Sequence, residues 1–357
     1  MRNEKDLIQI LINNYKKYPQ MQIEDFYKLI YQNEFAGGHL IDDAEGSYKY
    51  LKEEFSSLNK HDKSNSIFED IGNGLVRIYL NSLSDTAISL STVNKFFVNT
   101  ANFVMGSKEN FEEKLNIFLK CCREGILPYD IKKASYFLDE QKRKGYMHIS
   151  HSEEYRKAYQ PSYRVIKKEY AKYFDIFLII DEKCKRDEFV YAAIDGRCAS
   201  GKSTLAEMIS GVYDCNIFHT DDFFLPSELR IKTRLEEAGG NIDYDRFENE
   251  VIKGLKSKKA FKYQIYDCSK SSLTTFINVE PKKINIIEGA YSMHPKFSDI
   301  YQLKIFLHVD KEEQSRRLLS RNGEEIHKRF IKEWIPMEEK YFKEFNIKEK
   351  CDLVLKN

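Results

Sequence analysis

The sequence predicts a mostly α-helical N-terminal half followed by an α/β domain, in which a parallel sheet is flanked by helices. In the first half, apolar residues recur at helical spacing. We expect helices at residues 23–35, 44–58, 91–104, 110–124 and 131–144. In the second half, short apolar runs alternate with helical segments, and we expect strands near residues 190–195, 215–219, 283–288, 303–309 and 351–355. A highly charged stretch at 181–188 separates the halves, which predicts domains at 1–186 and 187–357.

The composition narrows the class of protein. The chain carries 57 Lys and Arg residues against 56 Asp and Glu residues, so a general affinity for polyanions is disfavoured. The seven cysteines are an odd number and form no C-x-x-C pair, which is typical of reduced thiols in the cytoplasm. The apolar run Ile176–Ile180 is far too short to span a bilayer. We therefore expect a cytoplasmic protein that does not enter a membrane.

The first apolar run of the second half leads into a phosphate-binding motif. Residues 196–204 read Gly-Arg-Cys-Ala-Ser-Gly-Lys-Ser-Thr, which is the Walker A pattern G-x-x-x-x-G-K-S between a strand and a helix. Its glycines permit a tight loop with inward N–H groups, its lysine reaches the β- and γ-phosphates, and its serine ligates Mg²⁺. The residues expected to bind ATP are Gly196, Ala199, Ser200, Gly201, Lys202, Ser203 and Thr204. The alternative is a chance match in an ordinary glycine turn. The sequence thus favours the P-loop NTPase fold for 187–357.

Acidic residues end two of the other expected strands. Asp221 and Asp222 follow the run at 215–219, and Glu288 ends the run at 283–288. Open α/β sheets bind ligands at the carboxyl ends of their strands. A carboxylate there can accept the proton of an attacking hydroxyl, and a second one can associate with Mg²⁺. We expect Asp221 to be catalytic, and Ser203 and Glu288 to lie at the metal.

Arginines cluster on the helical segment that follows the strand at 303–309. Arg316, Arg317 and Arg321 precede an Asn-Gly pair. Such a cluster on a mobile segment can close over the triphosphate and stabilise the charge in transfer. The alternative is a solvated helix face. We expect these arginines, with Lys202, to act in catalysis.

The first half contains two histidines that could face a ligand. His39 follows paired glycines at a helix end, and His151 precedes a segment in which Tyr155, Tyr159 and Tyr163 recur at four-residue spacing. We expect the histidines to help shape an acceptor pocket, although a structural role for each remains the alternative. The tyrosines form either the packing stripe of one helix, interrupted by Pro161, or a surface for a base, a phosphate or nucleic acid.

From about residue 189 to 355, the order of the motifs resembles that in the uridine kinase and nicotinamide riboside kinase branch of the nucleoside kinases. The diagnostic stretch is Asp221-Asp222-Phe223-Phe224-x-Pro226. The resemblance implies that Asp221 is the base toward a primary hydroxyl and that Asp222 supports it or the metal. It also implies that Asp243 contacts a ribose and that Tyr266 and Asp267 border the nucleoside pocket. The histidine and arginine that face the base in uridine kinases are absent after Tyr266-Asp267, so the resemblance does not extend to pyrimidine recognition.

These observations favour an ATP- and Mg²⁺-dependent small-molecule kinase that phosphorylates a hydroxyl, and the 5′-hydroxyl of a nucleoside or a related ribosyl compound is the favoured acceptor. The alternative is a nucleotide-dependent switch or regulatory ATPase, in which the helical half binds a partner. The near-neutral charge disfavours nucleic acid as a partner, and a homodimer remains open. The acceptor, the choice between ATP and GTP and the role of residues 1–186 are not specified by the motifs.

Overall fold

The structure is a computed structural model that describes residues 2–37, 43–58 and 66–357. The chain divides into two compact units, Met1–Leu178 (unit 1) and Ile179–Asn357 (unit 2). Each unit has its own hydrophobic core, as a domain requires. Within the described ranges, no helix is both long enough and apolar enough to cross a membrane.

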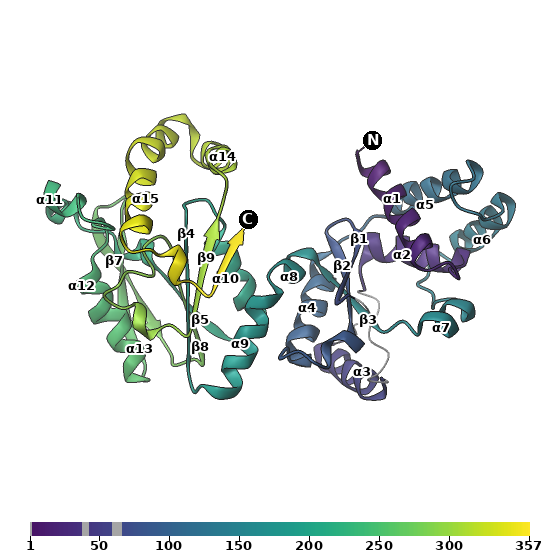
Figure 1. The fold of residues 1–357 in the computed structure, drawn as a ribbon, viewed down its shortest axis with the longest axis horizontal. Coiled ribbons are helices and arrows are strands. Elements are labelled where there is room, and N and C mark those ends of the chain that lie inside the picture. Colours follow the sequence, from purple (N-terminus) through teal and green to yellow (C-terminus); the bar gives the residue numbers. More distant parts are fainter. Residues whose placement is uncertain (1, 38–42, 59–65) are drawn as a thin grey trace. The chain divides into compact units, whose positions relative to one another are not determined.

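Unit 1 is mostly helical, as predicted (Figure 1). Its helices are α1 (Arg2–Lys17), α2 (Ile23–Phe35), α3 (Ala44–Ser57), α4 (Leu90–Phe103), α5 (Lys108–Arg123), α6 (Ile131–Arg143), α7 (Glu153–Tyr159) and α8 (Lys168–Lys172), and α9 (Phe174–Arg186) contains the division between the units. The helices from α2 to α6 lie within two residues of their predicted bounds. Their apolar faces form the core, where Phe26 of α2 stacks on Phe118 of α5 at a centroid distance of 5.3 Å.

Unit 1 also contains a small antiparallel sheet with the order β1-β2-β3, formed by β1 (Phe68–Gly72), β2 (Leu75–Tyr79) and β3 (Tyr163–Lys167). The third strand corrects the expectation that the tyrosine spacing continues one helix. Helix α7 ends at Tyr159 and is capped by Gln160, which adopts a left-handed φ of 41°, and Pro161 cannot continue the helical hydrogen bonding. Tyr163 therefore lies in a strand that pairs with Tyr79 of β2.

Unit 2 is built on a parallel sheet with the strand order β10-β9-β4-β8-β5. The strands are β4 (Val190–Gly196), β5 (Cys215–His219), β8 (Ile284–Glu288), β9 (Leu303–His308) and β10 (Leu353–Lys356). Figure 1 shows α10 (Lys202–Ser210) on one face, and α12 (Tyr244–Phe247), α13 (Lys253–Ser257) and α15 (Ile335–Glu344) on the other. This arrangement confirms the predicted α/β P-loop fold.

Three further elements of unit 2 lie outside the sheet. The longest is α14 (Lys311–Arg329), which is interrupted at Gly323, and a short helix, α11, spans Lys232–Leu235. The third is an antiparallel hairpin of β6 (Phe261–Asp267) and β7 (Ser272–Val279). We did not predict β7, because most of its side chains are exposed and it lacks the apolar run that marks the other strands.

The strand register brings the expected site to one edge of the sheet. Glu288, the last residue of β8, is paired with Ile194 of β4 and with His219 of β5. Because the strands are parallel, the segments that follow β4, β5 and β8 leave the sheet at the same edge. These segments carry the Walker A loop, Asp221 and Glu288.

Candidate active site

The Walker A loop has the backbone conformation that its glycines were expected to allow. Gly196 and Gly201 adopt φ values of +137° and +90°, and a Cβ on Gly196 would lie 2.2 Å from the Leu307 carbonyl oxygen. Lys202 folds back over the loop, where its Nζ donates to the carbonyl oxygens of Gly196 (2.9 Å) and Arg197 (3.0 Å). The loop can therefore accept no side chain at Gly196 without moving.

Two features of the loop fit a bound phosphate. The Ser200 hydroxyl is buried and has no hydrogen-bond partner among the described residues. A buried polar group of this kind is expected to have a partner, and a phosphate oxygen would supply one. Ser203 and Thr204 lie in the first turn of α10, where the helix N-terminus favours an anion.

Ser203 and Glu288 meet at the carboxyl end of the sheet. The Ser203 hydroxyl donates to Glu288 Oε1 at 2.9 Å. Mg²⁺ prefers oxygen ligands and usually keeps several waters, so one hydroxyl and one carboxylate beside a triphosphate suit it. Where the structure describes the chain, no three His, Cys, Asp or Glu side chains form a complete metal site. The pair thus fits a metal that is held mainly by phosphates and water.

His219 is a member of this group that we did not predict. Its Nδ1 lies 2.6 Å from Glu288 Oε1. The hydrogen bond to Glu288 raises the pKa of His219, although burial opposes the shift. The only sequence signal was its position immediately before Thr220-Asp221-Asp222, at the end of an apolar strand.

Asp221 lies beside the Walker A lysine and the Glu288 carboxylate. The residue is exposed, but the protein atoms around it exclude water from part of the carboxyl, which raises its pKa. Lys202 lowers the pKa and Glu288 raises it further, and Arg321 is also close enough to lower it. A carboxylate with a raised pKa is better suited to accept a proton than a fully solvated aspartate.

Asp222 and Asp243 face other partners. Asp222 Oδ2 accepts from the Tyr263 hydroxyl at 3.3 Å, and it makes no hydrogen bond with the Ser203–Glu288 pair. Asp243 caps α12 by accepting from the Arg246 N–H at 3.0 Å. Arg246 joins them, because its Nη2 donates to the Asp222 carbonyl oxygen and its Nε lies 3.9 Å from Asp243 Oδ2. The Asp222 side chain therefore contacts β6, while the charges of His219 and Asp221 also act on its pKa.

Tyr266 and Asp267 end β6 in different environments. Tyr266 is buried, and its hydroxyl has no hydrogen-bond partner in the ranges that the structure describes. Asp267 accepts from Ser269 Oγ at 2.6 Å and from the Ser269 N–H at 2.9 Å, so its carboxylate shapes the hairpin turn. Tyr266 retains a free donor for a ligand, whereas most of the Asp267 contacts are internal.

The three arginines lie on α14 with unequal contacts. Arg317 donates to the Ala199 carbonyl oxygen at 3.1 Å and pairs with Glu313. Arg316 is exposed and also pairs with Glu313, at 2.7 Å. Arg321 is exposed, and its positive charge lowers the pKa of Asp221. Arg317 thus contacts the loop, Arg321 acts on Asp221 through its charge, and Arg316 pairs within its own helix.

In unit 1, His39 lies outside the described residues, and His151 is buried in a chain of hydrogen bonds. His151 Nδ1 lies 2.6 Å from Asp25 Oδ1, and its Nε2 lies 2.6 Å from the Tyr163 hydroxyl. The His151 ring stacks on Tyr155 at 4.3 Å. Burial lowers the pKa of His151 to about 4, although Asp25 opposes the shift. Tyr155 is only 1% exposed, so its packing role is confirmed.

Glu338 of α15 is a second residue that we did not predict at the Walker A loop. It is buried, and its Oε2 accepts from the Cys198 N–H at 3.0 Å. Burial raises its pKa to about 7, although Lys202 lowers it. Its neighbour Glu339 pairs with Arg197 at 2.7 Å. Two consecutive residues of α15 therefore hold two consecutive residues of the loop.

No family model and no curated protein sequence matches the chain. Several solved structures resemble about half of it. Some of these structures are described as kinases. A "possible uridine kinase" from Bacillus stearothermophilus is 19% identical over 51% of this chain and 99% of its own, with a TM-score of 0.39. A protein assigned as a fructose transport system kinase from Silicibacter sp. TM1040 is 20% identical over 48% and 91%, with a TM-score of 0.40.

A shikimate kinase from Bacteroides thetaiotaomicron is 13% identical over 46% of this chain and 84% of its own, with a TM-score of 0.24. All these TM-scores are below 0.5. The α/β P-loop assignment of unit 2 therefore stands on its own strand order and Walker A loop.

The raised pKa of Glu338 predicts how the stability of unit 2 depends on pH. Its folded pKa of about 7 lies above the ordinary value of 4.5. The contribution of Glu338 to the free energy of unfolding is therefore fully present below pH 4.5 and is lost as the pH rises through 7. Glu338→Gln should remove this fall and leave unit 2 more stable than wild type at pH 8, by about 3 kcal/mol. Urea unfolding at pH 4.5 and pH 8, followed by the fluorescence of the single Trp334 in unit 2, measures this.

Glu344→Gln is the matched control, because Glu344 is an exposed residue of the same helix. It should change stability little at either pH. Equal losses of stability between pH 4.5 and pH 8 in wild type and Glu338→Gln would contradict the prediction.

Proposed function

We propose that unit 2 is a kinase that uses ATP and Mg²⁺ to phosphorylate a hydroxyl of a nucleoside or a related ribosyl compound. The observation that supports this most directly is the grouping of Lys202, Glu288 and Arg321 around Asp221 at the carboxyl edge of a P-loop sheet. Lys202 supplies positive charge for the phosphates. Asp221 is exposed to solvent, so an acceptor hydroxyl can reach its carboxylate and transfer a proton to it.

The residues present fit the proposed cofactors. Ser203 and Glu288 would hold Mg²⁺, and the Walker A amides with the Ser200 hydroxyl would hold the phosphates. When bound, Mg²⁺ neutralises charge on the phosphate oxygens. Arg317 already contacts the loop through Ala199, from which it can support the same charge.

The proposal of a ribosyl acceptor depends on polar groups that follow Asp221. The buried Tyr266 hydroxyl is free to hydrogen bond with a ligand, and the Asp243 carboxylate is held in place at the N-terminus of α12. Hydroxyl and carboxylate groups recognise the vicinal hydroxyls of a ribose by hydrogen bonding. All seven cysteines are free thiols, which supports a cytoplasmic location.

The experiment is a screen of the full-length chain with a panel of nucleosides and other ribosyl compounds, with Mg²⁺ and either ATP or GTP. Release of the nucleoside diphosphate is coupled to a spectrophotometric readout. We expect one class of ribosyl compound to raise that rate well above the rate with nucleotide alone. Turnover that responds only to a protein or an RNA would instead support the regulatory ATPase. A rate that no compound raises would contradict the kinase.

The structure does not favour an RNA-binding surface at the tyrosines of unit 1. Tyr155 is buried, and Arg164 pairs with Glu54 at 2.7 Å. A polymer's phosphates require exposed cations, and this arginine is already neutralised by a carboxylate.

A further inference from the structure

Unit 1 contains a pocket of about 120 Å³ that the proposed kinase chemistry does not use. Its polar lining consists of Lys28, Gln32, Glu54, His151, Tyr163 and Arg164. A cavity of this size is smaller than the roughly 300–1,000 Å³ that encloses a whole drug-sized ligand. It has room for about four waters, or for the head group of a ligand. A second cavity, near Phe189 in unit 2, has a volume of only about 10 Å³, which is too small for such a ligand.

Lys28 is a cation of this pocket without a salt bridge. Its Nζ donates to the Ile149 carbonyl oxygen at 3.1 Å, and the structure gives it no ion pair within the described ranges. Burial, together with a smaller contribution from the nearby Arg77, lowers the pKa of Lys28 to about 8. An ammonium group that loses water without gaining a carboxylate is destabilised, and an anion in the pocket would reverse this.

The carboxylates near Lys28 are already engaged. Glu54 accepts from Arg164 at 2.7 Å and from Ser162 Oγ at 2.6 Å. Asp25 accepts from the Ser152 hydroxyl at 2.6 Å as well as contacting His151. The hydrogen-bonding positions of these oxygens are therefore occupied by other groups. Neither carboxylate forms an ion pair with Lys28, although the charge of Asp25 partly opposes the lowering of the Lys28 pKa.

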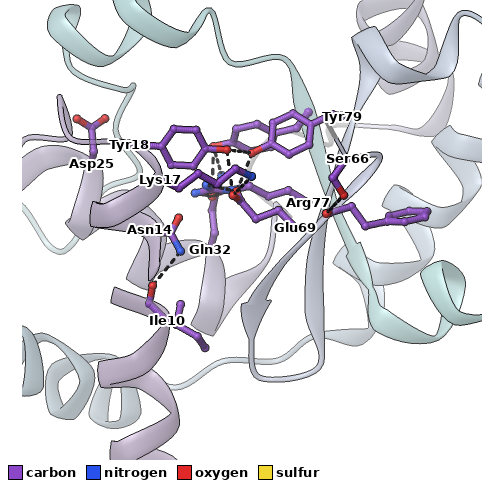
Figure 2. A network of polar contacts seen from close by, with 12 residues as sticks. Ile10, Asn14, Lys17, Tyr18, Asp25, Gln32, Ser66, Glu69, Arg77 and Tyr79 are labelled. Carbon is purple, nitrogen blue, oxygen red and sulfur yellow. Dashed lines mark hydrogen bonds and ion pairs between the residues drawn. The ribbon is translucent and has the colours of Figure 1, made fainter. Parts of the chain in front are cut away.

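A buried network holds the wall of the pocket in place. Figure 2 shows Glu69 between Lys17, Tyr18, Tyr79 and Arg77, with Gln32 beside the guanidinium. Arg77 Nη2 donates to Gln32 Oε1 at 2.8 Å. Since that oxygen is occupied, the Gln32 amide NH₂ remains the donor, and it lies 3.2 Å from the Tyr163 hydroxyl. The pocket thus presents an ammonium and an amide NH₂ as hydrogen-bond donors, whereas the Tyr163 hydroxyl is already engaged with His151 Nε2 at 2.6 Å.

We propose that this pocket binds an oxyanion head group, the phosphate or carboxylate of a small molecule, with Lys28 as its main ligand. The Gln32 amide completes the set of donors. The proposal does not depend on the function assigned to unit 2.

Hydrogen exchange of the full-length chain, followed by mass spectrometry, tests the proposal with inorganic phosphate and acetate as probes. At a probe concentration ten times its Kd, exchange in α2 and β3 should slow about tenfold, because binding stabilises the closed state by mass action. The phosphate and acetate arms distinguish the two anion classes. Peptides that cover residues 196–204 report separately on the Walker A loop, so the two sites can succeed or fail independently.

Lys28→Met should abolish the protection in α2 and β3, and Lys28→Arg should retain much of it. Lys132→Met, at an exposed position on α6, is the matched control and should behave as wild type. The Lys28→Arg variant keeps the test valid if Lys28→Met disturbs the fold. Absence of protection with both probes, or equal protection in Lys28→Met and Lys132→Met, would overturn the proposal.

Discussion

We expect Asp221→Asn to reduce turnover of the full-length chain by about a thousandfold, within the 10²–10⁴ range typical of a lost general base. The asparagine has nearly the same shape but cannot accept the acceptor's proton. The affinity for ATP should change little, because the loop amides, Lys202 and the Ser203–Glu288 pair remain in place. The measurement is kcat with the acceptor found by the screen, together with a separate titration of ATP binding.

Two further variants serve as a control and a comparison for Asp221→Asn. Asp299→Asn, at an exposed position of unit 2, should leave kcat unchanged. Lys202→Ala should instead weaken ATP binding, because it removes the cation from the loop. If Asp221→Asn retains wild-type turnover, Asp221 is not the base.

The parts of unit 2 that could be predicted are those whose signal is local. Glycines at 196 and 201 and an apolar run on one side identify a strand, a loop and a helix within about twenty residues. The ends of β5 and β8 could be placed together because parallel strands share an edge. Periodicity located α2 to α6 for the same reason, since each helix carries its own apolar face.

The parts that could not be predicted join distant segments. Glu338 contacts Cys198 across 140 residues of sequence, and no spacing rule connects a helix near one end of unit 2 to the Walker A loop. Tyr163 continued the four-residue spacing of Tyr155 and Tyr159, but the chain turns at Gln160 and joins β2. There the pairing of strands outweighed the helical pattern. Lys28 appeared only as one charge on an amphipathic helix, and its lack of an ion pair depends on tertiary contacts.

The second large effect that we expect is a loss of stability of unit 1 when Arg77 is replaced. Arg77 is fully buried on β2, it pairs with Glu69 at 3.1 Å, and its guanidinium lies 4.6 Å from the centre of the Tyr163 ring. Burial would raise the pKa of Glu69, but Arg77, Lys17 and Tyr79 lower it overall. The carboxylate therefore remains charged inside the protein. Arg77→Met leaves it without its buried counterion, which should destabilise unit 1 by about 3–5 kcal/mol.

Lys17→Met is the matched control, because Lys17 contacts the same carboxylate at 2.6 Å but is 46% exposed. A partly solvated pair contributes little, so we expect a loss of no more than about 1 kcal/mol. Hydrogen exchange of β1, β2 and β3 in the full-length chain gives the opening free energy of unit 1 for both variants. Adding Glu69→Gln to Arg77→Met should recover part of the loss, because the carboxylate left without its buried partner is then removed. Equal effects of Arg77→Met and Lys17→Met would show that burial of the ion pair does not determine the stability of this sheet.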